Sequence, residues 1–277
     1  MVSHFQRLVR MSKLVTKKSF VNVDFSTFCG FQTLAFGVQT GKGRALPVWL
    51  NCITYPIKIV GSQNIFVLEE IKRFGKTLGF YPSFVFDRGF WIPCVMKFLL
   101  KNKIHFYLRI KRGQQLFWEK EGKKMRAKYI GDHTKDATIL LFGYKMRLII
   151  SPPPPRQTNS KKPQNTQRWY ILTNDFQREK DDILDIYATR FEIEELFKDY
   201  KHIQKLKTLK INKKETFVIL LWFASLAFWI AWWLNGGTDD TAHPKKRRSF
   251  FRRFWESLQQ EVRIVGMQRV LGGSGCG

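Results

Sequence analysis

The chain begins with alternating hydrophobic and polar positions, the pattern of a strand with one buried face. In "SFVNVDFSTF" (19–28), Val21 and Val23 point to one side, and Asn22 and Asp24 point to the other. Because side chains alternate across a strand, this run predicts a half-buried β-strand that carries Asp24 on its polar side.

The following residues predict strands and helices in alternation. The expected elements are two strands within 31–55 joined by a Gly-rich turn at 41–43, a helix at 64–78, a short buried strand that ends at Asp87, a helix at 91–103, a strand at 104–111, β-rich runs within 113–150, a strand at 169–175 and one helix at 186–202. Three strands followed by alternating helices and strands are typical of an α/β fold with a mixed sheet.

Changes in composition divide the chain into five parts. The Pro-rich run "SPPPPRQTNSKKPQNTQR" (151–168) suits neither a helix nor a central strand and predicts an exposed loop. The predicted parts are a basic N-terminal arm (1–20), the first part of the α/β domain (21–112), a β-rich insertion with the Pro-rich loop (113–168), the second part of the domain (169–234) and a basic C-terminal tail with an amphipathic helix (235–277).

One run is hydrophobic throughout. "FVILLWFASLAFWIAWWL" (217–234) has no charge and is at the lower limit of transmembrane length. Basic residues flank it on both sides, so the positive-inside rule gives no orientation. We interpret it as a buried core helix rather than a membrane span, because it is single and barely long enough, and Ala224 and Ser225 suit close helix packing.

The charge of the chain favours an anionic partner. Lys and Arg number 48 against 22 Asp and Glu, which gives a formal net charge of +26. Nucleic acid is the first expectation from such a bias, and a membrane surface is the weaker one. The bland alternative is that the charge serves solubility alone.

The cysteines, the histidines and the N-terminal residues indicate the cellular compartment. The 4 cysteines and 5 histidines are scattered without CxxC spacing, which argues against a zinc site or a disulfide framework and fits a reducing cytosol. Residues 1–20 are basic and lack an apolar core, so they do not read as a secretory signal. We interpret them as an arm that contacts a nucleic-acid backbone.

Within the predicted helix 186–202, four side chains form one stripe. Tyr187, Arg190, Glu194 and Lys201 fall within an arc of about 60° at 3.6 residues per turn. Hydrophobic residues occupy another face, which can pack against a sheet. The stripe is therefore either solvated surface or the wall of an active site.

Three carboxylates stand in settings that suit a metal. Asp24 lies on the first strand, Asp87 ends a buried strand and Glu194 lies on the late helix. Magnesium prefers oxygen ligands, and two such ions can assist an in-line phosphoryl displacement. Each acid also has an ordinary interpretation: Asp24 as a polar strand residue, Asp87 as a turn cap and Glu194 as the i,i+4 partner of Arg190.

These residues lie in four ordered blocks that resemble a known family. "YATRFEIEELFKDYK" (187–201) fits the pattern Y-x2-R-x3-E-x6-K, which is typical of bacterial insertion-sequence transposases of the DDE class. "VNVDFSTF…GKGRALPVW" and "VFDRGF" resemble the blocks that carry the family's two aspartates, and "YILTND" resembles the strand before the signature helix. The resemblance spans residues 21–201.

The resemblance implies a fold, a chemistry and partners. The expected fold is a ribonuclease H-like mixed sheet flanked by helices, with a β-rich insertion before the last catalytic helix. Two Mg²⁺ ions, for which Mn²⁺ would substitute, are expected on Asp24, Asp87 and Glu194. The implied reaction is cleavage at transposon ends in double-stranded DNA, followed by attack of the freed 3′-hydroxyl on target DNA.

The same resemblance implies that Tyr187, Arg190 and Lys201 position the DNA backbone near the metals. Tyr offers a hydroxyl, Arg a planar fork for phosphate and Lys a point charge. Further phosphate contacts are expected from Arg109, Lys111 and Arg44. Trp118 is interpreted as a core residue rather than a base-stacking one.

Family members usually carry a helical DNA-recognition region before the first aspartate, whereas 23 residues precede Asp24 in this sequence. The expectation is that recognition depends on the basic arm and tail, or that the chain is a shortened copy. The alternatives to a transposase are therefore an inactive DNA-binding remnant and a nuclease of the same fold. A homodimer is expected in the synaptic complex, because two element ends must be joined, and the location is expected to be the prokaryotic cytoplasm, at the nucleoid, without a membrane.

Overall fold

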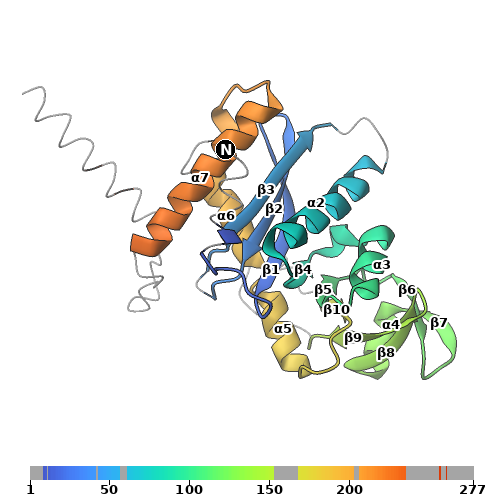
Figure 1. Ribbon diagram of the computed structural model, residues 1–277. Coiled ribbons are helices and arrows are strands. Elements are labelled where there is room, and N and C mark those ends of the chain that lie inside the picture. The colour runs from blue at the N-terminus through green and yellow to red at the C-terminus, as the bar shows by residue number, and fades with distance from the viewer. Residues whose placement is uncertain are drawn as a thin grey trace, which may run out of the picture.

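In the part of the chain that the structure describes, ten strands pair into one mixed sheet (Figure 1). The computed structural model describes residues 9–10, 12–41, 43–56, 61–152, 168–202, 206–234, 256 and 260. The strands are β1 (Phe20–Phe28), β2 (Phe31–Val38), β3 (Leu46–Thr54), β4 (Ser83–Phe86), β5 (Phe106–Arg109), β6 (Gln115–Trp118), β7 (Lys123–Arg126), β8 (Asp136–Leu141), β9 (Tyr144–Ile150) and β10 (Tyr170–Thr173). The helices are α2 (Ser62–Leu78), η1 (Arg88–Phe90), α3 (Pro93–Lys101), α4 (Ala127–His133), α5 (Lys180–Ala188), α6 (Phe191–His202), η2 (Leu206–Thr208) and α7 (Lys214–Leu234).

The strand order is β3-β2-β1-β4-β5-β10-β9-β8-β6-β7. Strand β1 is parallel to β4, which is parallel to β5, whereas β2 is antiparallel to both β1 and β3. The first five strands thus have the order and directions of a ribonuclease H-like sheet. The predicted fold class, a mixed sheet flanked by helices, is confirmed.

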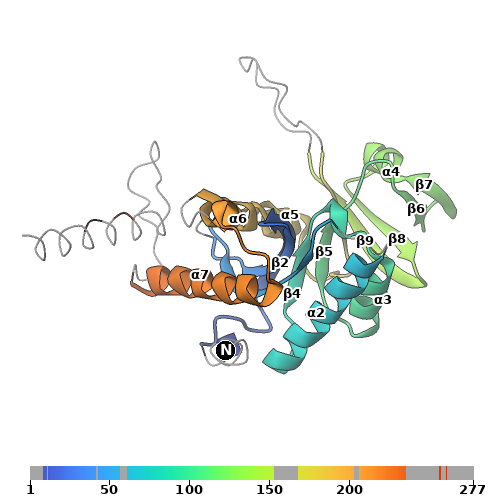
Figure 2. The ribbon, with the colours of Figure 1, turned by 90° about the horizontal axis from the view of Figure 1, so that it is seen from above.

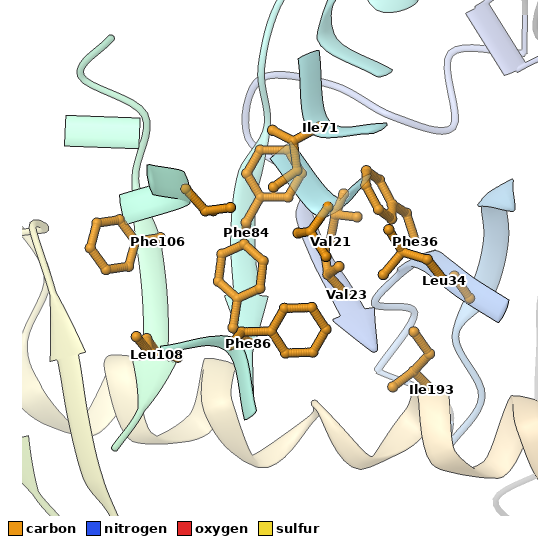
Figure 3. Close-up of a cluster of buried hydrophobic side chains, with 14 of the residues drawn as sticks. Val21, Val23, Leu34, Phe36, Ile71, Phe84, Phe86, Phe106, Leu108 and Ile193 are labelled. Atoms are coloured by element: carbon orange, nitrogen blue, oxygen red, sulfur yellow. The ribbon is translucent and has the colours of Figure 1, made fainter. Parts of the chain in front are cut away.

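The central strands share a hydrophobic core (Figure 3). Aromatic side chains of neighbouring strands and helices meet there: the rings of Phe36 and Phe74 are 5.1 Å apart, and those of Phe36 and Phe84 are 6.1 Å apart. Burial of such apolar surface contributes about 25 cal/mol per Å². This packing fixes the register of the strands, because a slip of one residue would turn every core side chain outward.

Helices cover both faces of the sheet, α2 and α3 on one and α5 and α6 on the other (Figure 2). The polar side of β1 is therefore not open to solvent along its length. Asn22 is fully buried, and its amide donates to the carbonyl of Thr189 over 3.3 Å. Gln39 completes this contact with a hydrogen bond of 2.7 Å to Asn22.

The insertion continues the sheet instead of forming a separate layer. Strand β9 pairs with β10, and β8, β6 and β7 follow it outward. The sequence predicted β6, β8 and β9, but missed β7 and α4, which are short and rich in charged residues. Residues 153–167 of the Pro-rich loop lie outside the described residues, as do residues 1–8 and 11 of the predicted arm and most of the predicted tail.

The prediction of a single helix over 186–202 is wrong. Helix α5 ends at Ala188 and α6 begins at Phe191, with a turn between them. Thr189 explains the break: its side-chain hydroxyl bonds to the carbonyl of Ile186 over 2.8 Å, while its own carbonyl accepts from Asn22. Such side-chain bonds compete with a continuous helix, and the partner on β1 is not visible in the local sequence.

Helix α7 packs along β3, the edge strand of the sheet. The indole of Trp229 donates to the carbonyl of Pro47 over 2.7 Å, and the hydroxyls of Tyr200 and Ser225 lie 2.8 Å apart. By length and composition α7 is the one helix among the described residues that is able to cross a membrane. In its most apolar stretch 39% of the residues are buried, and Trp233 on its outer side is 80% exposed.

Candidate active site

Two of the three predicted acids are neighbours across the sheet. The parallel register of β1 and β4 pairs Val23 with Phe86. Continued by one residue, it places Asp24 beside Asp87, on the face that α5 and α6 cover. Adjacent strands lie about 4.8 Å apart, so the pairing brings these two carboxylates to one point at the edge of the sheet. Convergence of Asp24 and Asp87 follows from the register that the core enforces.

Arg190 joins the third acid to the first. Its Nη1 lies 3.4 Å from Oδ2 of Asp24, and its Nη2 forms an ion pair with Oε1 of Glu194. The turn between α5 and α6 directs the guanidinium inward, where it is 10% exposed, while the side chain of Glu194 is 48% exposed. Glu194 thus lies at the rim of the site and Asp24 on its floor.

Tyr187 contacts the second aspartate. Its hydroxyl donates to Oδ1 of Asp87 over 3.0 Å, and its ring centroid lies 5.8 Å from the guanidinium carbon of Arg190. The ring itself is buried among hydrophobic residues of β4, β5 and β9. Tyr187 and Arg190 therefore connect all three carboxylates.

The electrostatics of the site reflect burial and crowded negative charge. Burial raises the pKa of Asp24 from 3.8 to about 6, against a hydrogen bond from the amide of Phe25 and the charge of Arg190. Asp87 and Glu194 raise the pKa of Asp24 further. Asp24 therefore exchanges a proton near neutral pH.

The neighbouring cation and phenol are held in their usual protonation states. Burial lowers the pKa of Arg190, but Tyr187, Asp87 and Glu194 outweigh it and raise the pKa overall. Burial raises the pKa of Tyr187, which Arg190 opposes and Asp87 reinforces. At neutral pH the site thus contains one fixed cation and one neutral hydroxyl.

A residue that the sequence did not single out anchors α6. Glu192 is buried, and its carboxylate accepts hydrogen bonds from the amides of Thr40 at 2.9 Å and Gly43 at 3.0 Å. Its backbone carbonyl accepts from the amide of Ala45 at 3.1 Å. The Gly-rich turn, whose amides need an acceptor, was the only signal for this partner.

Arg44 belongs to the same anchor. Its Nε lies 2.8 Å from Oδ2 of Asp199, and its Nη2 lies 3.4 Å from Oε2 of Glu195. Both acids are on α6, about one turn apart. In this structure Arg44 holds α6 against the β2–β3 turn, and its expected phosphate contact stays a prediction.

The other predicted DNA contacts lie around this centre. Lys201 is two turns beyond Glu194 on α6, with its ammonium 5.4 Å from the ring centroid of Phe28. Arg109 is the last residue of β5, and its charge opposes the rise in the pKa of Tyr187 that burial causes. Lys111 follows it and shares a cavity of about 550 Å³ with Asp87.

Trp118 lies away from the acids. It is 4% exposed on β6, and its ring lies tilted beside the ring of His133 with the centroids 6.0 Å apart. This burial agrees with the interpretation of Trp118 as a core residue.

The donor chemistry of the site fits a divalent cation, although no single three-acid cage is formed. Among the described residues, no three His, Cys, Asp or Glu side chains gather closely enough to hold one ion together. Magnesium needs only one or two carboxylates per ion and takes its remaining ligands from water and phosphate oxygens. The paired strand aspartates and Glu194 at the rim provide oxygen ligands of that kind.

Comparison with known proteins identifies the class. A family model described as "Transposase DDE domain" matches residues 67–230, a range that includes Asp87 and Glu194. The chain therefore belongs to the transposase DDE domain family. No curated protein matches the chain.

Among solved structures, this chain is similar to a chain in a cryo-EM structure of a piggyBac transposase synaptic complex with hairpin DNA. Sequence identity to it is 12%, with a TM-score of 0.48 over 88% of this chain and 52% of that chain. This chain thus spans about half the length of that transposase.

Proposed function

We propose that this protein is a DNA transposase that cleaves transposon ends and joins the freed 3′-hydroxyl to target DNA. The observation that carries the proposal is the connection of Asp24, Asp87 and Glu194 through Arg190 and Tyr187, in a chain that belongs to the transposase DDE domain family.

Asp24, Asp87 and Glu194 would hold the divalent ions, with Mg²⁺ as the expected ion and Mn²⁺ as its substitute. The chemistry that the ions supply when bound is activation of the attacking oxygen and stabilisation of the leaving oxygen. Asp24 and Asp87, fixed by the strand register, give the site its rigid part. Glu194 at the rim can adjust its carboxylate to the phosphate that enters.

Arg190 and Tyr187 act on the carboxylates before they act on DNA. Arg190 orients Asp24 and Glu194, and Tyr187 orients Asp87. When a phosphodiester enters, the guanidinium can exchange a carboxylate oxygen for a phosphate oxygen, since both accept its planar fork. We assign Lys201, Arg109 and Lys111 to the DNA backbone on either side of the scissile phosphate.

The partners follow from this chemistry. Double-stranded DNA, as transposon ends and as target, is the substrate, and the formal charge of +26 favours its binding at low salt. Two ends must be brought together, so we propose a homodimer in the synaptic complex. The proposed location is the cytoplasm of a prokaryote, in association with the nucleoid.

The test is cleavage and strand transfer on duplexes that carry the repeats flanking the gene. We expect nicked and joined products with Mg²⁺ or Mn²⁺, and none with EDTA or with Asp87→Ala. Asp182→Ala, at an exposed acid on α5, is the matched control and should retain full activity.

The products separate the alternatives. Nicked DNA without joined DNA would identify a nuclease of the same fold, and salt-sensitive DNA binding without metal-dependent cleavage would identify an inactive remnant. Activity that survives Asp87→Ala would overturn the proposed role of the three acids.

A further inference from the structure

A basic cavity opens beside the acids, where the catalytic domain meets the insertion. Its volume is about 530 Å³. Its lining is dominated by six cations, namely Arg88, Arg109, Lys111, Arg112, Lys128 and Arg168. Among the described residues that line it, Asp132 is the only acid. We call this cavity the basic cradle.

The walls of the basic cradle are fixed by backbone hydrogen bonds. The amide of Ile110 donates to the carbonyl of Tyr170 over 2.8 Å, which ties the segment after β5 to β10. The amide of Lys128 donates to the carbonyl of Arg112 over 2.9 Å, which ties the start of α4 to the same segment. The cations are therefore carried by one connected framework.

Gly131 allows α4 to lie this close. A Cβ at that position would come within 2.9 Å of the Tyr170 ring and 3.3 Å of Ile150. The close approach lets Lys128 and Asp132 of α4 line the cradle together with Arg109.

The positive charge of the basic cradle is only slightly neutralised within the protein. Asp132 forms an ion pair with Arg168 at 3.4 Å, and the side chain of Asp132 is 49% exposed. Exposed pairs of this kind contribute about 0–1 kcal/mol, so Arg168 can turn to another anion at little cost. The other cations face the same space without a second acid among the described lining residues.

The basic cradle continues into the site of the acids. A second cavity of about 550 Å³ is lined by Asp87 and by Arg88, Ile110 and Lys111, and those last three residues also line the cradle. A path thus leads from Asp87 past Arg88 to Lys128 on the insertion. The six cations distributed along it can contact several phosphates at once, which suits a nucleic-acid backbone better than one small anion.

We propose that the basic cradle binds the sugar-phosphate backbone of duplex DNA beyond the scissile phosphate, so that α4 of the insertion holds the substrate strand as it leaves the acids. This inference rests on the proposed function and adds Arg88, Arg112, Lys128 and Arg168 to its DNA contacts. Contacts to phosphate carry no sequence information, so the cradle positions DNA without selecting its sequence.

The first experiment locates the DNA on the full-length protein by lysine acetylation and mass spectrometry, in EDTA. The probe is a 30-base-pair duplex of arbitrary sequence. We expect it to protect Lys111 and Lys128 from acetylation, and to leave Lys76 and Lys101 reactive. These control lysines lie at the ends of α2 and α3. Each of these helices leads to the start of a strand, β4 or β5, whereas Asp87 follows the last residue of β4.

Equal reactivity of Lys128 with and without duplex would overturn the proposal. Protection by inorganic pyrophosphate but not by duplex would also overturn it, because the cradle would then be a small-anion site. Since no metal is present, this result is independent of cleavage: an active transposase with an unprotected Lys128 refutes the cradle alone, and a protected Lys128 without cleavage refutes the proposed function alone.

The second experiment measures the salt dependence of duplex binding for Lys128→Gln/Arg168→Gln against the control Lys76→Gln/Lys101→Gln. Each lost phosphate contact makes the slope of log K against log salt shallower by about 0.9. We expect a change of about 2 for the cradle variant and none for the control. Thermal unfolding checks that both variants fold, and equal slopes for two folded variants would overturn the proposal.

Discussion

Oδ2 of Asp24 lies 3.4 Å from Nη1 of Arg190, so this acid of the site already has a cation beside it. The second nitrogen of the same guanidinium contacts Glu194. An arginine that contacts two proposed metal ligands keeps them near each other without an ion, which limits the rearrangement needed when metal and DNA bind.

Arg190→Lys should impair both stability and cleavage. A single ammonium cannot contact Asp24 and Glu194 with the geometry of a planar guanidinium. Because these side chains are partly exposed, we expect a loss of about 1–2 kcal/mol in the free energy of unfolding. Cleavage should fall at least about 100-fold, since misplacement by about 1 Å has that effect. Urea denaturation and cleavage assays measure the two effects, and unchanged cleavage would contradict the role of Arg190.

Tyr187→Phe isolates the hydrogen bond to Asp87. The ring is buried and should keep its packing, so we expect little change in thermal stability. A hydrogen bond to a charged group contributes about 1.5–3 kcal/mol, which corresponds to a loss of about 10- to 100-fold in cleavage rate if it orients Asp87. Tyr144→Phe, on an exposed tyrosine of β9, is the control. A large fall in stability without a fall in rate would assign Tyr187 a packing role instead.

The raised pKa of Asp24 predicts a pH dependence of stability in metal-free protein. Burial moves the pKa from 3.8 to about 6, so between pH 4 and 6 the folded state binds a proton that the unfolded state has lost. The contribution of Asp24 is therefore most favourable below about pH 4 and is lost as the pH rises through 6. Partial exposure reduces the expected loss to about 1–2 kcal/mol.

Asp24→Asn removes this titration. In urea denaturation in EDTA, the free energy of unfolding of the variant relative to the wild type should increase as the pH rises from 4 to 7. Asp182→Asn on α5 should show the same pH dependence as the wild type. A constant difference between Asp24→Asn and wild type over that range would contradict the raised pKa.

Arg44→Gln tests whether Arg44 anchors α6 or contacts DNA. The change leaves the side chain of Asp199, which is 7% exposed, without its guanidinium partner, so we expect a loss of about 2–3 kcal/mol in the free energy of unfolding. Lys72→Gln, in an exposed pair with Glu69, should cost less than about 0.5 kcal/mol. The salt slope of DNA binding should not change for Arg44→Gln, and a shallower slope would restore Arg44 as a phosphate contact.

Helix α7 should behave as part of the core. Phe228 is fully buried against the ring of Tyr200, with the centroids 5.3 Å apart, so Phe228→Ala should cost about 3–5 kcal/mol. Trp233→Ala, at the exposed end of the helix, should cost less than about 0.5 kcal/mol. Fractionation of expressing cells completes the test, because recovery of the folded protein with membranes would favour a membrane span.

Most of the strands could be predicted, because their signals are local or lie in quoted motifs. The alternation around Asp24 and the apolar run before Asp87 marked β1 and β4 closely. The break at Thr189 could not be predicted, since it depends on Asn22, a residue distant in sequence. Glu192 was missed for the same reason: α6 carries three other acids, and only its partners in the β2–β3 turn distinguish Glu192 from them.

The pairing of Val23 with Phe86 has a consequence for how this chain tolerates insertions and deletions. Removal of one residue between Val21 and Asp24 would either reverse the carboxylate to the side of α2 or force valine out of the interior. Frame-preserving changes of a single codon in β1 should therefore abolish folding or activity, whereas point substitutions nearby remain tolerable. Sensitivity of the protein to the number of residues in β1 would show that strand register positions the site.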